Sequence, residues 1–325
     1  MAHSRLSTAL AEGLIDLPDG PVAVYRPPVG YDLVGLARDR VRIVTTWRPD
    51  YDGWAAGGYA VSADPVVAPV AVVVVPRAKA LARSLIAQAA ATAQLVVVDG
   101  QTTDGVNSLF RDCRARLGDL PSLPKAHGRL FWFVPDGQFA DWAAPQPQRG
   151  EHGFTTTAGV FSDGSIDAGS ELLADALPAK MPKRIADLGA GWGYLAAAVL
   201  ARDGVQRVDL FEAEKLALDC ARLNIPDSRA EFHWTDATGL RRAEFDGVVM
   251  NPPFHVGRAA DPGLGRAMID AAARVLTPSG QMWMVANRHL PYEAHLAARF
   301  RNVTDLPGSG GFKLFHASRP LGAAR

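Results

Sequence analysis

Two short motifs in the second half of the chain carry residues whose types and spacing could support chemistry. The first is Asp187-Leu-Gly-Ala-Gly-Trp-Gly193, which follows an apolar stretch and precedes a helical one. Glycines in a strand–helix turn permit a tight bend and a close approach of a ligand to the backbone. The acidic side chain at the strand end disfavours a phosphate and suits a positively charged group, which favours S-adenosylmethionine over a dinucleotide. Unless this is a plain turn with an incidental aspartate, the expected cofactor contacts are Asp187, Gly189, Ala190, Gly191 and Gly193.

The second motif is Asn251-Pro-Pro-Phe254, which closes another apolar stretch. Its two prolines fix φ and remove two backbone donors, so that carbonyls stay free. The Asn251 side-chain oxygen and the Pro252 carbonyl could both accept hydrogen bonds from one planar –NH2 group, and Phe254 could stack on the attached ring. The motif therefore predicts methyl transfer to a planar nitrogen without a strong base, with Asn251, Pro252, Pro253 and Phe254 as catalytic residues and Asn251 also beside the cofactor. The alternative is a proline-rich strand cap.

Two further acids follow apolar stretches that lie between these motifs. Glu212 comes 25 residues after Asp187, a spacing suited to hydrogen bonds with ribose hydroxyls. Asp236, with Ala237 beside it, could accept a hydrogen bond from an adenine amine. Helix capping is the alternative for both acids, and Asp236 is a plausible N-cap.

The elements that must position these motifs alternate between strands and helices in the second half. We predict strands at 184–188, 207–211, 231–233, 246–250, 281–286, 302–306 and 312–317, and helices at 194–202, 214–223, 265–276 and 291–300. The last two strands are separated by only Pro307-Gly-Ser-Gly-Gly311, which is too short for a crossover helix and makes them antiparallel. This predicts a seven-stranded, mostly parallel sheet whose last strand is reversed.

The first half shows the same alternation without a glycine turn of this kind. We predict strands at 22–25, 42–45, 70–75, 95–98 and 129–134, and helices at 78–93 and 106–117, which indicates a parallel-sheet α/β domain. Asp99 and Asp104 are expected to be turn and N-cap residues. Residues 143–150, with two prolines and no apolar periodicity, are typical of a linker. The predicted domains are therefore residues 1–145 and residues 151–325.

The composition excludes several classes of protein. Lys+Arg and Asp+Glu are both 34, so the chain lacks the basic field with which many proteins grip long nucleic acid. Two cysteines, each expected within a helix, cannot form a disulfide framework. The longest apolar run, residues 66–75, is shorter than the ~20 residues that span a bilayer. With no signal-like N-terminus, we expect a cytoplasmic protein that uses neither membrane nor metal.

These motifs resemble the class I S-adenosylmethionine-dependent methyltransferases with an Asn-Pro-Pro-[Phe/Tyr] loop. More closely, the chain is similar to the bacterial ribosomal RNA guanine-N2 methyltransferases of the small-subunit type and their large-subunit cousins. The resemblance covers most of residues 155–318 and rests on Gly159–Ser170, the Asp187 turn, Asn251–His255, Val285–Asn287 with Leu290–Tyr292, and Gly311–Phe315.

The resemblance implies two tandem Rossmann-like methyltransferase domains, of which the N-terminal one is degenerate and serves RNA binding or structural support. It also implies that the segment before the first catalytic strand lies over the cofactor, which would bring Phe161, Asp167 and Ser170 to the site. An N-cap role for Ser170, at a helix over residues 171–176, is the alternative.

The reaction that follows is transfer of a methyl group from S-adenosyl-L-methionine to the exocyclic N2 amine of a guanine in ribosomal RNA. The expected partner is ribosomal RNA or a ribosomal subunit, bound by a monomer. The expected RNA contacts are Phe254, His255, Arg258, Arg266 and Arg288. Methylation of a protein glutamine amide or an adenine amine stays open, as does a non-catalytic RNA-binding assembly factor, although Asp187, Glu212 and Asn251 argue against the last.

Overall fold

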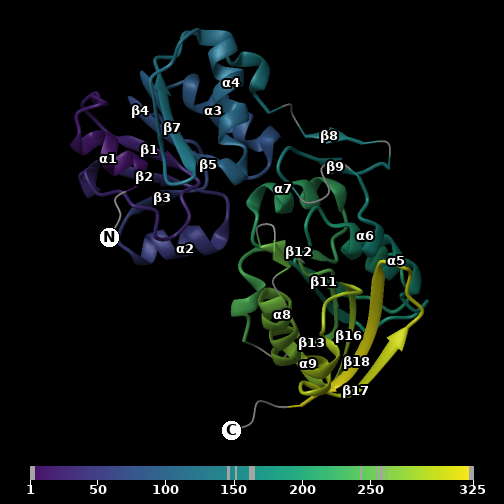
Figure 1. The fold of residues 1–325 in the computed structure, drawn as a ribbon. Coiled ribbons are helices and arrows are strands. Elements are labelled where there is room, and N and C mark those ends of the chain that lie inside the picture. The colour runs from purple at the N-terminus through teal and green to yellow at the C-terminus, as the bar shows by residue number, and fades with distance from the viewer. Residues whose placement is uncertain are drawn as a thin grey trace. The chain divides into compact units, whose positions relative to one another are not determined.

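The chain folds into two compact units, Met1–Gln146 and Pro147–Arg325, in a computed structural model (Figure 1). The structure describes residues 4–144, 147–150, 152–160, 165–241, 244–253, 255–256, 259–260 and 262–321. No helix within these ranges is both long enough and apolar enough to cross a membrane.

A seven-stranded sheet forms the centre of the second unit. Its strands are β10 (Arg184–Leu188), β11 (Arg207–Glu212), β12 (Ala230–Trp234), β13 (Phe245–Met250), β16 (Leu276–Asn287), β17 (Phe300–Leu306) and β18 (Phe312–Pro320). They lie in the order β12-β11-β10-β13-β16-β18-β17. Only β18 runs antiparallel to its neighbours, β16 and β17, so the predicted reversal of the last strand is confirmed. Two short pairs accompany the sheet, β8 (Gln148–Arg149) with β9 (Thr155–Thr156) and β14 (His255–Val256) with β15 (Ala259–Ala260).

Helices cover both faces of this sheet, because strand residues point alternately to either side. On one face Ala186 and Val248 join a core with α8 (Pro262–Val275) and α9 (Glu293–Ala297). On the other, Ile185 and Val249 join a core with three further helices, α5 (Ala168–Ala176), α6 (Tyr194–Leu200) and α7 (Lys215–Asn224). The result is a three-layer α/β unit, with α8 and α5 on opposite sides in Figure 1.

The first unit contains a second seven-stranded sheet with the same strand order. Its strands, β1 (Val22–Tyr25), β2 (Val41–Val44), β3 (Ala60–Ser62), β4 (Val70–Val74), β5 (Leu95–Gln101), β6 (Ser122–Lys125) and β7 (Gly128–Phe133), are ordered β3-β2-β1-β4-β5-β7-β6. Its helices are α1 (Arg5–Ala11), α2 (Arg48–Ala56), α3 (Lys79–Ala90) and α4 (Val106–Leu117). Two tandem Rossmann-like sheets are thus present, as the predicted fold class requires.

Several predictions for the first unit are wrong. Its sheet is not wholly parallel, because β7 runs antiparallel to both β5 and β6. The cause is a two-residue turn at Ala126 and His127, whose φ values of 50° and 55° are those of a tight hairpin turn. The sequence patterns did not predict α1, α2, β3 and β6, since these elements are short and only partly apolar.

Asp99 and Asp104 do not play their predicted roles. Asp99 lies buried within β5, which continues to Gln101 because it pairs with β7 along that length. Asp104 lies in a 3-10 turn, and the N-cap of α4 is Gly105. The two cysteines do match their prediction, since Cys113 on α4 and Cys220 on α7 are buried free thiols.

Candidate active site

The candidate site lies at the carboxyl edge of the second sheet, where β10 and β13 are neighbours. The chain leaves these two strands toward opposite ends of the strand order, which opens a crevice between their loops. A small cleft occupies this place and is lined by Asp167, Ser170, Gly189, Ala190, Gly191, Trp192, Tyr194, Leu195 and Asn251. The structure therefore brings both sequence motifs to a single cleft.

The glycines after β10 take conformations that side chains disfavour. Gly189, Gly191 and Gly193 have φ values of 75°, 56° and 95°. A Cβ atom added to Gly193 would lie 2.8 Å from the Cδ1 atom of Ile225, so this glycine is needed for close packing. A Cβ atom at Gly191 would meet nothing within 4 Å, which leaves open space at the turn. Gly193 thus serves the fold, whereas Gly191 leaves room for a ligand.

Asp187 is fully buried beneath this turn, at the end of β10. Neither of its carboxylate oxygens has a hydrogen-bond partner of normal geometry among the described residues. Burial, followed by the negative charge of Glu212, raises the pKa of Asp187 to about 8. A buried carboxylate without partners is costly unless a cation neutralises it. Among the described residues no cation pairs with Asp187, which is what a site for a positively charged ligand would show.

Glu212 ties the end of β11 to the glycine turn. Its Oε2 accepts a hydrogen bond from the Gly191 N–H at 2.8 Å, and its Oε1 accepts one from the Glu214 N–H at 2.7 Å. Burial nevertheless raises the pKa of Glu212. Each carboxylate oxygen can accept a further hydrogen bond, so the geometry is compatible with the predicted ribose contact.

Asn251 follows β13 and has its side-chain amide held from one side. Its Nδ2 donates to Asp167 Oδ1 and to Ser170 Oγ, both at 2.7 Å. A carboxylate can only accept, so Asp167 dictates that the amide nitrogen faces it. The opposite atom, Asn251 Oδ1, is buried and has no hydrogen-bond partner among the described residues. An acceptor is therefore aimed into the cleft and left for a ligand.

Asp167, rather than Ser170, caps helix α5. Its Oδ1 accepts the Ser170 N–H at 2.9 Å, and Ser170 lies inside the first turn. The alternative of Ser170 as N-cap is therefore wrong. The resemblance had brought Asp167 to the site, but no residue pattern indicated its bond to Asn251, which lies 84 positions away.

Asp236 follows strand β12, and the structure shows that its side chain caps a turn. Its Oδ1 accepts from the N–H and the hydroxyl of Thr238, at 2.8 and 2.7 Å, and so caps the 3-10 turn Ala237–Gly239. Neither Asp236 nor Ala237 lines the cleft described above. Three residues that line the cleft were not predicted to do so, namely Trp192, Tyr194 and Leu195. Trp192 and Tyr194 pack with Phe154 in an aromatic cluster. The tryptophan within the glycine turn was the sequence feature that could have indicated this cluster.

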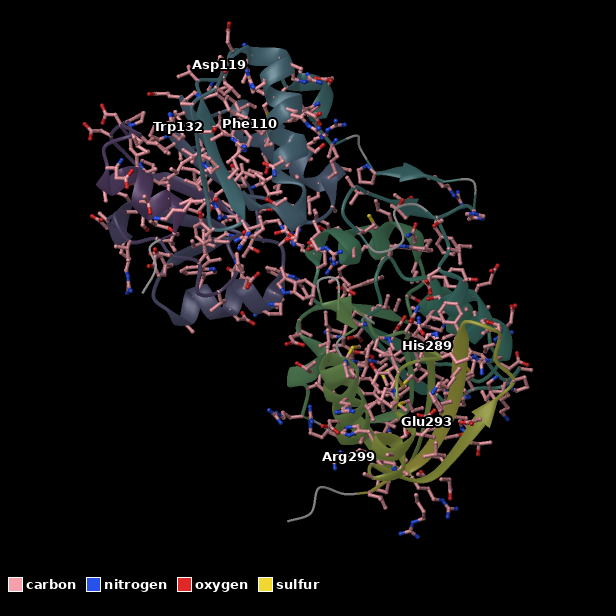
Figure 2. All side chains as sticks on the ribbon, in the orientation of Figure 1. Phe110, Asp119, Trp132, His289, Glu293 and Arg299 are labelled. Atoms are coloured by element: carbon pink, nitrogen blue, oxygen red, sulfur yellow. The ribbon has the colours of Figure 1, made fainter. Side chains whose placement is uncertain are left out.

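The predicted RNA contacts are only partly visible. Phe254 and Arg258 lie outside the described residues, and His255 is described only as the start of β14. Phe161, which was predicted to contact the cofactor, also lies outside them. Arg266 is exposed on α8. Arg288, next to the His289 that Figure 2 labels, donates to the backbone carbonyls of Ser309 and Gly310 and so fastens the loop between β17 and β18.

One group of potential metal ligands occurs among the described residues. Asp209, Glu231 and His233 lie close together on β11 and β12. The Arg207 guanidinium makes ion pairs with both acids, at 2.6 Å to Asp209 and 3.1 Å to Glu231. A metal cation would have to displace this arginine, so we assign no metal to the group.

The chain is similar in sequence to known proteins. The family model described as methyltransferase small domain matches residues 151–316. The ribosomal RNA small subunit methyltransferase C of Shewanella sp. (strain MR-4) is 31% identical over 259 residues, which cover 75% of this chain and 75% of that relative. The ribosomal RNA large subunit methyltransferase G of Alcanivorax borkumensis is 34% identical over 176 residues, which are 52% of this chain but only 45% of that relative.

One solved structure covers nearly the whole chain. It is the T. thermophilus 16S rRNA N2 methyltransferase in complex with AdoMet and guanosine. It superposes with a TM-score of 0.80 over 97% of this chain and 92% of that chain, at 24% identity. At this identity the likeness concerns the fold, and it extends over both units.

Proposed function

The chain belongs to the methyltransferase small domain family, and from this premise we propose that it transfers a methyl group from S-adenosylmethionine to the N2 amine of a guanine in ribosomal RNA. We further propose that residues 151–325 form the catalytic domain and that residues 1–145 form a degenerate partner domain. The relatives named above are enzymes that act on ribosomal RNA. We expect the protein to work in the cytoplasm, where that substrate lies, and as a monomer, which light scattering would test.

The observation that carries this proposal is the orientation of Asn251. Its amide nitrogen is bound by Asp167 and Ser170, and its Oδ1 is buried without a partner among the described residues. An exocyclic amine is a planar donor that matches such an acceptor. A ring nitrogen without a proton or a substrate carbonyl would not, because neither can donate.

The chemistry of the residues in and beside the cleft also suits the proposed cofactor. When bound, S-adenosylmethionine supplies an electrophilic methyl group and carries positive charge. Asp187 is the residue that would hold this charge, since its two oxygens are buried and have no hydrogen-bond partner of normal geometry in the described part of the chain. Gly191 provides the open space beside the turn, and Glu212 provides acceptors for hydroxyl groups.

The residues of the chain then act on the substrate amine. Asn251 Oδ1 accepts one N–H of the amine, and the Pro252 carbonyl accepts the other. Two acceptors on one –NH2 group turn its lone pair out of conjugation with the ring and toward the methyl donor. The nitrogen–carbon bond forms as the donor's sulfur–carbon bond breaks, and the surplus proton of the amine then passes to water. A base held in an RNA helix must first be splayed out to reach this cleft.

Purified protein incubated with small-subunit ribosomal RNA and isotope-labelled S-adenosylmethionine tests the proposal. We expect labelled N2-methylguanosine in the digested RNA, identified by mass spectrometry. Label found only in methyladenosine, or only in a protein glutamine when ribosomal proteins are supplied, would overturn the guanine assignment. Asn251→Ala should lower turnover by about 100-fold while cofactor affinity stays near that of the natural protein. An equal loss of both would mean that Asn251 serves the cofactor site alone.

A further inference from the structure

The hairpin formed by β8 and β9 lies against the glycine turn of the candidate active site. It stands at the start of the second unit, and β9 lies beside α7 (Figure 1). The Phe154 ring, which directly precedes β9, packs on the rings of Trp192 and Tyr194, with centroids 5.0 and 5.7 Å away. Trp192 belongs to the turn, and both of these partners line the cleft. The hairpin therefore contacts residues that give the cleft its shape.

One side chain joins this hairpin to the turn, that of Asn224, the last residue of α7. Its Oδ1 accepts the Thr155 N–H at 2.6 Å, and its Nδ2 donates to the Thr155 carbonyl at 2.9 Å. The same Nδ2 donates to the Trp192 carbonyl at 2.8 Å. A backbone N–H can only donate and a carbonyl can only accept, so these partners determine which way the amide faces. Both hydrogens of the amide are thus engaged, one by each carbonyl.

The bond from Asn224 reaches a peptide group that is also held on its other side. This group consists of the Trp192 carbonyl and the Gly193 N–H, and the latter donates to the Ala190 carbonyl at 2.9 Å. Gly193 in turn packs against Ile225, the residue that follows Asn224 in the chain. The end of α7 therefore fixes the turn through one hydrogen bond and one close apolar contact.

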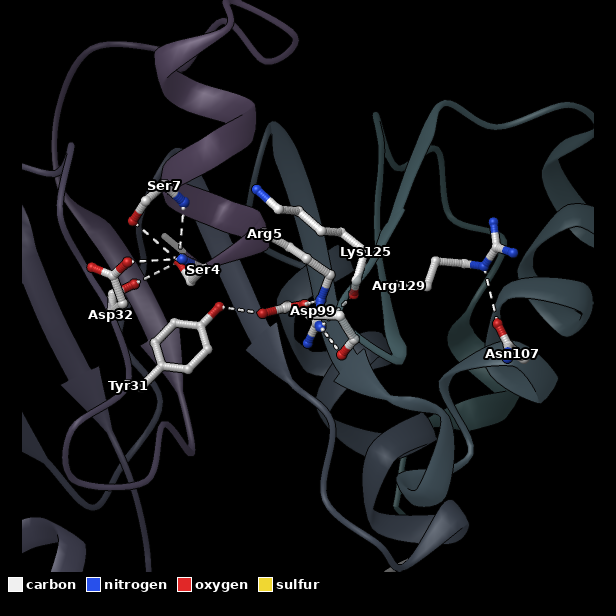
Figure 3. A network of polar contacts seen from close by, with 10 residues as sticks. Ser4, Arg5, Ser7, Tyr31, Asp32, Asp99, Asn107, Lys125 and Arg129 are labelled. Carbon is white, nitrogen blue, oxygen red and sulfur yellow. Dashed lines mark hydrogen bonds and ion pairs between the residues drawn. The ribbon is translucent and has the colours of Figure 1, made fainter. Parts of the chain in front are cut away.

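The first unit uses buried polar groups differently. Figure 3 shows Asp99, near the carboxyl end of β5, accepting from Arg5 Nε at 2.5 Å and from the Tyr31 hydroxyl at 2.7 Å. These bonds join side chains to one another. The bonds of Asn224, in contrast, end on the backbone of a turn that borders the cleft, so they bear on how a ligand is bound.

The turn is a segment in which such a bond matters. Gly191 and Gly193 flank Trp192, and glycine has more accessible backbone conformations than any other residue. A binding segment that is already held in one shape loses less conformational freedom when the ligand binds, and the affinity is higher for that reason. Without Asn224, the Trp192 peptide group loses this restraint and the turn can take other shapes.

We propose that Asn224 is a positioning residue for S-adenosylmethionine, which holds the Trp192 peptide group so that the glycine turn keeps the shape that binds the cofactor. The hairpin supplies the second anchor, because Thr155 fixes the Asn224 amide from the other side. Asn224 is not among the residues that line the cleft, so it acts through the turn. This role rests on the proposed function, since the ligand is the methyl donor of that reaction.

Two variants of the whole protein test this role. Asn224→Ala removes all three hydrogen bonds. Asn224→Asp keeps an acceptor for the Thr155 N–H, but its ionised carboxylate has no hydrogen to donate to the Trp192 carbonyl. We expect each variant to raise the KM and the dissociation constant of S-adenosylmethionine by about tenfold. Turnover at saturating cofactor and the KM for RNA should stay unchanged, because Asn251 and its partners are not touched.

Two control variants separate positioning from a loss of stability. Asn302→Ala removes a side-chain hydrogen bond of 3.2 Å to Ser318 Oγ, on the outermost strand β17. Val275→Ala shortens a buried side chain at the end of α8, beside the start of β13 and thus at the opposite edge of the sheet from the cleft. Val275→Ala should lower the temperature of thermal unfolding. Neither control should change the dissociation constant of the cofactor.

The outcomes are read by calorimetry with S-adenosylmethionine, which needs no RNA. If both Asn224 variants lower the unfolding temperature but bind the cofactor like the natural protein, the residue is merely structural and the inference is overturned. Natural affinity in Asn224→Asp alone would also overturn it, because the bond to Trp192 would then not be needed. If the variants weaken cofactor binding but ribosomal RNA gains no N2-methylguanosine, the proposed function fails and the positioning role stands. If RNA is methylated and the variants bind normally, the function stands without it.

Discussion

At the scale of single residues, the orientation of one amide decides what the site can do. Asn251 could present either its oxygen or its nitrogen to a ligand, and the two groups call for opposite substrates. Asp167 settles the matter because its carboxylate accepts the Asn251 N–H bond at 2.7 Å. Under the proposed function, Asp167 need not touch the substrate and yet selects an amine as the group to be methylated.

This positioning role predicts different outcomes for two substitutions of Asp167. Asp167→Ala should lower turnover by about tenfold, because the amide can then rotate, and should cost about 1 kcal/mol through loss of the α5 cap. Asp167→Asn keeps an acceptor oxygen and should restore most of the turnover. Steady-state kinetics and thermal unfolding of both variants check this. Equal turnover in the two variants would contradict an orienting role.

The buried carboxyl of Asp187 predicts a proton linked to cofactor binding. Its pKa of about 8 keeps it protonated at lower pH in the free protein, whereas a bound cation favours the ionised form. Binding below about pH 8 should therefore release a proton, and affinity should fall as the pH is lowered. Calorimetry of S-adenosylhomocysteine and S-adenosylmethionine in buffers of different ionisation enthalpy measures this release. Asp187→Asn should abolish the release for the positively charged ligand and weaken binding.

The raised pKa of Asp187 also makes the stability of the free protein depend on pH. An unfolded aspartate ionises above about pH 4, while the folded one stays protonated up to about pH 8. The carboxyl therefore favours the fold fully below pH 4, and this contribution is lost as the pH rises toward 8. Asp187→Asn should lack this loss in thermal unfolding experiments.

At the scale of elements, the turn after β10 contains one glycine that packing requires and another that leaves room for a ligand. Gly193 has a left-handed φ of 95°, and an added Cβ would lie 2.8 Å from Ile225. Gly191 shares the unusual backbone but faces open space. The two glycines lie in the same turn, but packing explains Gly193 and the open space beside the turn explains Gly191.

Alanine at each position should reveal the difference. Gly193→Ala should lower the free energy of unfolding by roughly 2–4 kcal/mol, from strain and overpacking together. Gly191→Ala should cost about 1 kcal/mol of stability but markedly weaken cofactor binding. Chemical denaturation and calorimetry measure the two effects. A larger loss of stability in Gly191→Ala than in Gly193→Ala would show that the roles are reversed.

At the scale of the whole molecule, the chain forms two sheets with the same strand order and has a formal net charge of zero. The 34 basic and 34 acidic side chains balance, so binding of RNA must come from local groups. We therefore expect a homopolymer such as polyuridylate to compete poorly with ribosomal RNA at moderate salt, unlike its behaviour with basic RNA-binding modules. Inhibition of methylation by equal concentrations of polyuridylate would contradict this.

The sequence by itself determined the architecture of the second unit and the chemistry of its motifs. Apolar periodicity located each of its seven strands, and the short Pro307–Gly311 connection predicted the reversed one, because local spacing limits how a chain can turn. The motifs were recognisable because Asp187 and its glycines lie within one short segment, and Asn251 and its prolines lie within another. The same reasoning failed for α1, α2, β3 and β6, whose short lengths carry too little periodic signal.

Only the tertiary structure decided which groups meet across long separations. It placed Asp167 against Asn251 and put Asp99 inside a strand between Arg5 and Tyr31. It also buried the oxygens of Asp187 with no partner of normal hydrogen-bond geometry among the residues that the structure describes. It also showed that the two sheets have the same strand order. Such contacts depend on strand order and register, which join residues far apart in the chain. The types of residue thus indicated the reaction, and the packing of the sheets determined which atoms are available to carry it out.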